Sequence, residues 1–131
     1  MTDLQKRLIE AAQKARMNAR AKYSNFKVGA ALLTADGQIF TGCNIESSSY
    51  GLTVCAERVA LFKALSEGAD DFTQLAVATS IDPPGSPCGA CRQLLWDYAR
   101  DIEIILAGDN SVVELTSLKA LLPRPFGDED I

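Results

Sequence analysis

Histidine is absent from the 131 residues of this chain. Its absence excludes Ser-His-Asp and Cys-His catalysis, and it excludes any histidine-ligated metal site. The chain also has no apolar run near the ~20 residues that a membrane-spanning helix needs. Its first residues lack the charged and then apolar segments of a signal peptide. We therefore expect a cytoplasmic protein without membrane contacts, in which the cysteines are reduced.

The composition is that of one globular domain, with 47% hydrophobic and 23% charged residues. A length of about 100–200 residues is usual for a single domain. We expect one domain over residues 1–131, with a loose acidic tail at 127–131. The formal net charge is −4, and the sequence contains no run of Lys and Arg. This charge balance argues against a polynucleotide partner.

The hydrophobic pattern predicts both helices and strands. Helices are expected at 2–22, 54–67, 87–100 and 117–122, and strands at 26–34, 38–43, 72–80, 102–107 and 112–115. Thr2 and Gln5 fit a capping box at the first helix. Ser86 is expected to cap a helix that begins at Pro87. A hairpin in the first half, followed by alternating strands and helices, predicts a mixed sheet with helices on both faces.

Three of the four cysteines lie in two short motifs, Cys55-Ala56-Glu57 and Pro87-Cys88-Gly89-Ala90-Cys91. Cys88 and Cys91 are one helical turn apart, so their sulfurs point to the same side. A redox couple would use this pair but leave Cys55 without a role, and a disulfide conflicts with a reducing compartment. Zinc explains all three cysteines. Three ligands leave a fourth position open to water, which is typical of a catalytic zinc site.

A structural zinc site with four cysteine ligands is the competing interpretation. Such sites usually contain two Cys-x₂₋₄-Cys pairs. Cys43 lies twelve residues before Cys55 and has no such partner. We therefore interpret Cys43 as a small packing side chain, and a non-catalytic, zinc-stabilised module remains the alternative.

Three thiolates give a Zn²⁺ site a net charge of −1, which weakens the metal as a Lewis acid. Two helix N-termini would offset this charge, and Arg58 and Arg92 could donate hydrogen bonds to the thiolates. Glu57 follows Cys55 by two residues. In a chain without histidine, its carboxylate is the natural proton carrier. The alternative is that Glu57 only stabilises the first turn of its helix.

These residues closely resemble the small homotetrameric cytidine deaminases. The likeness is carried by residues 23–31, 42–46, 50–58 and 86–93, by Leu121-Leu122-Pro123 and by Phe126. It extends over essentially the whole chain. It implies a three-layer α/β/α cytidine deaminase-like fold with a mixed five-stranded sheet.

The resemblance also implies the reaction, which is hydrolytic deamination of cytidine and 2′-deoxycytidine to uridine and 2′-deoxyuridine in pyrimidine salvage. Cys55, Cys88 and Cys91 would bind one Zn²⁺ per chain. Water activated by the zinc would attack C4 of the pyrimidine. Glu57 would shuttle protons to N3 and to the departing ammonia.

The substrate contacts follow from the same resemblance. The N–H of Ala56 would hold the base carbonyl, and Phe26 would pack against the pyrimidine. Asn44 and Glu46 would hydrogen-bond the ribose hydroxyls. From the residues alone, a core aromatic at the start of a strand is the favoured interpretation of Phe26, and turn chemistry is the alternative for Asn44 and Glu46.

Members of this family complete the site across the subunits of a homotetramer. A neighbouring subunit would bring Ser48 and Tyr50 to the 5′ end of the sugar and Phe126 to the base. Tyr50 and Phe126 could equally be interface anchors. Two other deaminases are weighed. A blasticidin-type antibiotic is less consistent with Asn44 and Glu46 than an ordinary ribose, and a polynucleotide substrate is less consistent with the acidic charge balance.

Overall fold

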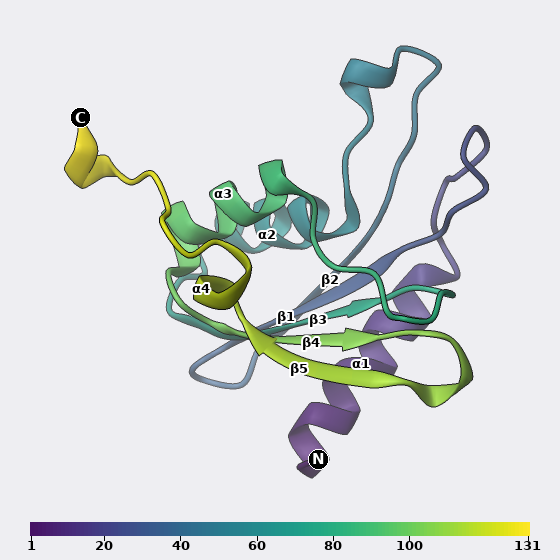
Figure 1. Ribbon diagram of the computed structural model, residues 1–131, viewed down its shortest axis with the longest axis horizontal. Helices are drawn as coiled ribbons and strands as arrows, with labels where there is room; N and C mark the ends of the chain where they lie inside the picture. The colour runs from purple at the N-terminus through teal and green to yellow at the C-terminus, as the bar shows by residue number, and fades with distance from the viewer.

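A computed structural model describes residues 1–131. A five-stranded sheet crosses the molecule in the order β2-β1-β3-β4-β5 (Figure 1). The strands are β1 (Gly29–Thr34), β2 (Ile39–Cys43), β3 (Phe72–Ala78), β4 (Glu103–Ala107) and β5 (Val113–Ser117). Only β3 and β4 are parallel, and the other neighbours are antiparallel. The predicted mixed five-stranded sheet is therefore confirmed.

Helices cover both faces of the sheet, and each face has its own core. Helix α1 (Asp3–Arg16) packs on one face, where Leu8 belongs to a cluster of nine buried residues that includes Ile105. Helices α2 (Ala56–Ser66), α3 (Gly89–Ala99) and the short α4 (Leu118–Leu121) lie on the other face. The cluster there has 14 buried residues and includes Ile104. Because successive side chains of a strand point to opposite faces, Ile104 and Ile105 serve different cores, and the three-layer arrangement is confirmed.

The helix boundaries differ from the sequence-based expectation at two places. The capping box of Thr2 and Gln5 is confirmed, but α1 ends at Arg16 rather than near residue 22. The expected N-cap of α3 is wrong, because Cys88 and not Ser86 occupies that position. The hydroxyl of Ser86 accepts a hydrogen bond from the side chain of Arg92 instead of from a helix N–H.

Residues 17–28 form neither the end of a helix nor the start of a strand. They lie along the segment that follows β2. The N–H of Arg20 donates to the carbonyl of Asn44, and the N–H of Glu46 donates to the carbonyl of Arg20, both at 2.9 Å. Strand β1 then begins at Gly29, where an added Cβ would lie 1.9 Å from the carbonyl oxygen of Ala12. This close approach of strand and helix fixes where the segment enters the sheet.

The segment between β2 and α2 projects away from the sheet at the upper right of Figure 1 and carries a short 3-10 helix, Tyr50–Leu52. The chain ends on the opposite side of that view, in the last of three 3-10 helices, Asp128–Asp130. Arg100 pairs there with Asp128 at 3.0 Å and with Glu129 at 3.6 Å. No helix combines the length and the apolar character that a membrane span requires.

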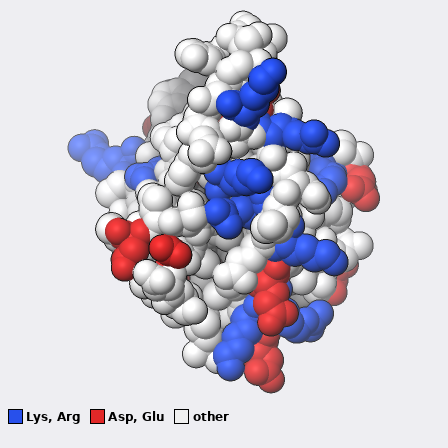
Figure 2. All heavy atoms as spheres, turned by 90° about the vertical axis from the view of Figure 1, so that its right-hand side faces the viewer, with Lys and Arg blue, Asp and Glu red and all other residues white.

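Basic side chains are unevenly distributed over the surface. Figure 2 shows Lys and Arg across the middle of one face, with Asp and Glu mostly toward its edges. Seven of the 13 basic residues precede β1 in the sequence: Lys6, Arg7, Lys14, Arg16, Arg20, Lys22 and Lys27. The face in Figure 2 carries more basic than acidic side chains across its middle, although the formal net charge of the chain is −4. The argument from overall charge against a polynucleotide partner is weaker than the sequence indicates.

Candidate active site and metal centre

A cavity of about 270 Å³ lies between the segment before β1, the segment after β2, the start of α2, the end of β3 and the loop before α3. Seven of the residues predicted from the sequence line it: Phe26, Asn44, Glu46, Cys55, Ala56, Glu57 and Cys88. Cys91 belongs to the same cluster of sulfurs and is fully buried. The fold thus brings five separate segments of the chain to one site.

Two helix N-termini bring the three sulfurs together. Cys55 is the N-cap of α2, Cys88 is the N-cap of α3, and Cys91 lies in the first turn of α3. The Sγ atoms of Cys55 and Cys88 are 3.7 Å apart, and those of Cys88 and Cys91 are 3.4 Å apart. Two ligands at ~2.3 Å from a tetrahedral zinc would be separated by about 3.8 Å. The three cysteines therefore fit a zinc shell with one position left open.

Cys43 is not part of this cluster. It ends β2 opposite Gly29, and it is half-buried. The group of potential metal ligands contains only Cys55, Cys88 and Cys91. This geometry favours the three-cysteine interpretation over a structural site with four cysteine ligands.

Positive charge lies next to the sulfurs, as expected if it offsets the negative charge of three thiolates on zinc. The N-termini of α2 and α3 both meet the cluster, and each carries a partial positive charge. Arg58 donates from Nη2 to Sγ of Cys55 at 3.7 Å. The hydrogen bond from Cys91, followed by that from Arg58, lowers the pKa of Cys55 to about 5 despite its burial. The contact with Cys55 and burial together raise the pKa of Cys91.

Arg92 differs from the prediction, because its hydrogen bonds all go to oxygen atoms rather than to a thiolate. Its Nε donates to the carbonyl of Pro87 at 2.7 Å, and its Nη2 donates to the hydroxyl of Ser86 at 2.9 Å. Its Nη1 donates to the carbonyl of Leu121 at 2.7 Å. The prediction of a hydrogen bond to sulfur is therefore wrong for Arg92. The side chain instead links the backbone just before Cys88 to the end of α4 through hydrogen bonds to both carbonyls.

Glu57 lies in the first turn of α2 and is only 5% exposed. Burial is the largest cause that raises the pKa of this carboxyl to about 7, although the N–H of its own residue and the charge of Arg58 act in the opposite direction. A carboxyl with such a pKa can hold or release a proton near neutral pH. Its position in the cavity wall gives it access to a bound molecule.

Asn44 supports the segment that carries Phe26. Its Oδ1 accepts from the N–H of Val28, and its Nδ2 donates to the carbonyl of Phe26, both at 2.8 Å. An amide has further capacity on both atoms. Asn44 therefore combines a structural role with one free donor and one free acceptor site for a ligand.

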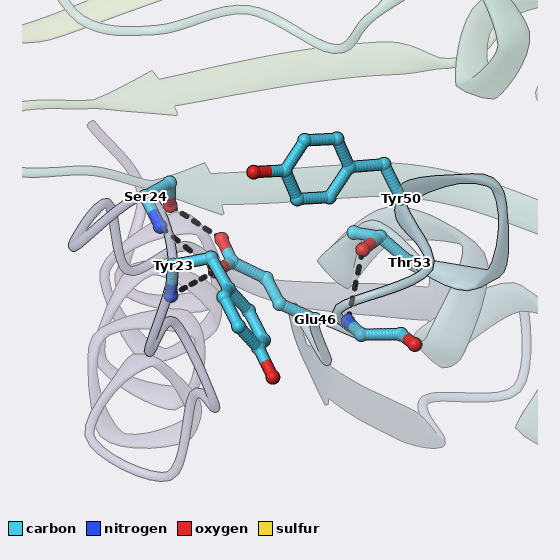
Figure 3. A pocket seen from close by; sticks show the side chains of 6 residues that line it. Tyr23, Ser24, Glu46, Tyr50 and Thr53 are labelled. Carbon is cyan, nitrogen blue, oxygen red and sulfur yellow. Dashed lines mark hydrogen bonds between the residues drawn. The ribbon is translucent and has the colours of Figure 1, made fainter.

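Glu46 is held by three donors from the segment before β1 (Figure 3). Its Oε1 accepts from the backbone N–H groups of Tyr23 at 2.9 Å and Ser24 at 3.0 Å, while its Oε2 accepts from the Ser24 hydroxyl. These bonds, with the Ser24 hydroxyl as the largest cause, hold the pKa of the Glu46 carboxyl below its ordinary value. The sequence-based prediction does not include Ser24. Ser24 lies within residues 23–31, which carry the resemblance described above, and Ser and Asn together favour a turn just before Phe26.

Ser48, Tyr50 and Phe126 do not line the cavity beside the sulfurs. Tyr50 is 78% exposed and Phe126 is 57% exposed. Tyr50 lines a neighbouring cavity of about 310 Å³ that shares Glu46 and Ser24 with the first (Figure 3). The carbonyl of Phe126 accepts from Nε2 of Gln93 at 2.7 Å. Contacts of these three residues with a neighbouring subunit's site stay a prediction.

Comparisons with known proteins agree with this geometry. A family model described as the cytidine and deoxycytidylate deaminase zinc-binding region matches residues 2–107. The chain is 46% identical over 126 residues to a cytidine deaminase of Sporosarcina psychrophila, covering 95% of this chain and 93% of that protein. A crystal structure of cytidine deaminase from Burkholderia pseudomallei superposes with a TM-score of 0.90 at 49% identity, covering 96% of this chain and all of the other. A blasticidin-S deaminase of Bacillus cereus is 38% identical over 107 residues, covering 76% of each chain.

Proposed function

The chain belongs to the cytidine and deoxycytidylate deaminase family, and from this premise we propose that it hydrolyses cytidine and 2′-deoxycytidine. Water and the nucleoside give uridine or 2′-deoxyuridine and ammonia. One observation carries the proposal. Glu57 and the sulfurs of Cys55 and Cys88 line the same cavity as the nucleoside-facing Phe26 and Asn44.

Zinc, when held by Cys55, Cys88 and Cys91, supplies a water molecule acidic enough to attack C4 of the base near neutral pH. Glu57 accepts a proton from the attacking water and gives it to N3. It then takes the remaining proton from the new C4 hydroxyl and gives it to the amino group, which leaves as ammonia while C4 becomes a carbonyl. The raised pKa of Glu57, about 7, suits a group that must take up and release a proton repeatedly.

The other residues of the cavity hold the nucleoside. The N–H of Ala56 begins α2, so it has no acceptor within the helix and is free to bind the base carbonyl. Phe26 packs against the base. The free amide sites of Asn44 and the carboxylate of Glu46 meet the ribose hydroxyls.

We further propose a homotetramer in which a neighbour completes each site. Tyr50 lies on the segment between β2 and α2, and Phe126 lies near the C-terminus. Neither contributes to the cavity of its own chain. Phe62 of α2 is 45% exposed, which suits a helix that packs against another subunit. A reducing cytoplasm suits a site built on three free thiols.

A blasticidin-type antibiotic is the second candidate substrate, favoured by the likeness to the Bacillus cereus enzyme. Asn44 and Glu46 favour an ordinary ribose because both line the cavity with polar side chains suited to hydroxyl groups. Ultraviolet absorbance with cytidine, 2′-deoxycytidine and blasticidin S, together with a zinc assay on the same sample, tests the choice. Turnover of the antibiotic alone would overturn it, and a zinc-loaded protein that converts none of the three would support a non-catalytic module.

A further inference from the structure

We propose that Ser24 is a positioning residue that couples the sugar-facing Glu46 to the base-facing Phe26. The inference rests on the proposed function, in which these two side chains contact different parts of one nucleoside. Ser24 lines the active-site cavity and the neighbouring cavity at once. Ser24 therefore lies between the two cavities, where the sugar of a bound nucleoside would contact the protein.

The Ser24 hydroxyl has one hydrogen, and the structure determines where that hydrogen goes. Oγ accepts from the N–H of Phe26 at 3.0 Å, so its own hydrogen is available for Oε2 of Glu46. A carboxylate with a lowered pKa accepts hydrogen bonds and donates none. The chain of bonds runs in one direction, from the Phe26 backbone through the hydroxyl to Glu46.

A strained residue keeps this arrangement in place. Asn25, between Ser24 and Phe26, has a φ of 59° and donates its N–H to the carbonyl of Ala21 at 2.8 Å. Asparagine adopts this left-handed conformation more readily than most residues. The turn lets the N–H and the hydroxyl of Ser24 face Glu46 together while Phe26 continues toward the cavity.

The hydroxyl also determines the rotation of the carboxylate. Both backbone donors bind Oε1, and the Ser24 hydroxyl is the single donor on Oε2. Oε2 keeps a free lone pair for a hydroxyl of the sugar. Without the Ser24 hydroxyl, Oε2 would lose its hydrogen-bond donor, and the protein would no longer fix the direction of the free lone pair.

This role makes a prediction that a purely structural role does not make. If the hydroxyl only stabilised the turn, its loss would affect every substrate equally. If it positions Glu46, its loss affects a nucleoside with ribose hydroxyls more than one without them. The relevant pair is cytidine and 2′,3′-dideoxycytidine, which share the base and the 5′ hydroxyl.

The experiment compares the wild-type protein with Ser24→Ala, Ser24→Thr and the control Ser66→Ala. Ser66 is an exposed serine of α2 whose hydroxyl bonds only to the carbonyl of Lys63. Loss of one hydrogen bond to a charged group corresponds to about a tenfold change in kcat/KM. We expect Ser24→Ala to show this loss with cytidine, mainly through KM, and a clearly smaller loss with dideoxycytidine. Ser24→Thr, which keeps the hydroxyl, should restore most of the activity.

Dideoxycytidine is measured as a substrate, or as a competitor of cytidine where its turnover is slow. Thermal unfolding and zinc content are measured for every variant, so that a folding defect is recognised. An equal loss on both nucleosides, or no loss on cytidine, would overturn the positioning role. A wild-type protein that converts no cytidine would instead remove the proposed function, and the two failures are distinguishable.

Discussion

The guanidinium of Arg92 donates from Nε to the carbonyl of Pro87 at 2.7 Å, and Pro87 is the residue that directly precedes Cys88. The same guanidinium reaches Ser86 and the carbonyl of Leu121. Arginine presents several donors in one rigid plane, so it can fix several acceptors at once. Arg92 therefore holds the backbone directly before Cys88, and we expect it to orient this zinc ligand through the backbone rather than through sulfur.

Arg92→Lys should weaken zinc binding without unfolding the chain. Lysine keeps the charge, but it cannot reach three acceptors in the same plane. Loss of groups that orient metal ligands typically lowers metal affinity by about 10–100-fold. Competition with a chromogenic chelator measures the loss. Arg124→Lys, at an exposed position, is the matched control, and equal zinc affinity in the two variants would contradict the role of Arg92.

Glu57→Gln should leave a folded, zinc-loaded protein that has lost most of its deaminase activity. The amide is similar in size but cannot accept and return the proton. Roles in general acid–base catalysis contribute about 10²–10⁴-fold, and Glu57 is proposed to act more than once. Single-wavelength ultraviolet assays of cytidine conversion measure the change. An unchanged rate would refute the proposed mechanism and favour the non-catalytic module.

Substitution of single cysteines should distinguish the zinc ligands from Cys43. Cys91→Ala removes a buried ligand, so we expect it to abolish stoichiometric zinc binding and deamination together. Cys43→Ala should retain about one zinc per chain, because Cys43 lies outside the cluster. Metal analysis after dialysis gives the stoichiometry. Loss of zinc from the Cys43 variant would restore the four-cysteine interpretation.

Local patterns predict the metal centre well because its chemistry depends on short spacings. Cys88 and Cys91 are placed together by one helical turn, and Thr2 and Gln5 form their cap within one turn. These features depend on neighbouring residues in the chain. The sequence is therefore sufficient to predict which helices and strands exist and that the sulfurs of Cys88 and Cys91 lie together. Cys55 lies 33 positions before Cys88, and its place in the cluster follows from the ligand number of zinc rather than from local spacing.

The features that the sequence does not predict depend on contacts between distant segments. Arg20 pairs with Asn44 through the backbone, and this pairing replaces the helical turn expected at residue 20. Ser24 gains its role only because Glu46, 22 positions later, lies beside it. The Arg92 guanidinium binds Leu121, 29 positions away. No local propensity or periodicity reports such pairings, because they arise from tertiary packing.

Gly42→Ala should destabilise the fold and disturb the site together. An added Cβ at Gly42 would lie 2.5 Å from both the carbonyl oxygen of Ala56 and the N–H nitrogen of Ala60. Both contacts are with the backbone of α2, which cannot move aside as a flexible side chain can. Overpacking of this kind costs about 1–3 kcal/mol or more. Because α2 begins directly after Cys55 and carries Glu57, its displacement should also reduce zinc affinity.

Gly51→Ala is the matched control for this prediction, since nothing lies within 4 Å of an added Cβ there. Thermal unfolding and chelator competition are measured on both variants. For a domain of this size, the expected loss corresponds to a fall of about 3 °C or more in Tm for Gly42→Ala, whereas Gly51→Ala should keep the wild-type Tm. If Gly42→Ala unfolded at the wild-type temperature with unchanged zinc affinity, close packing of α2 on β2 could not be what holds Cys55 and Glu57 in place.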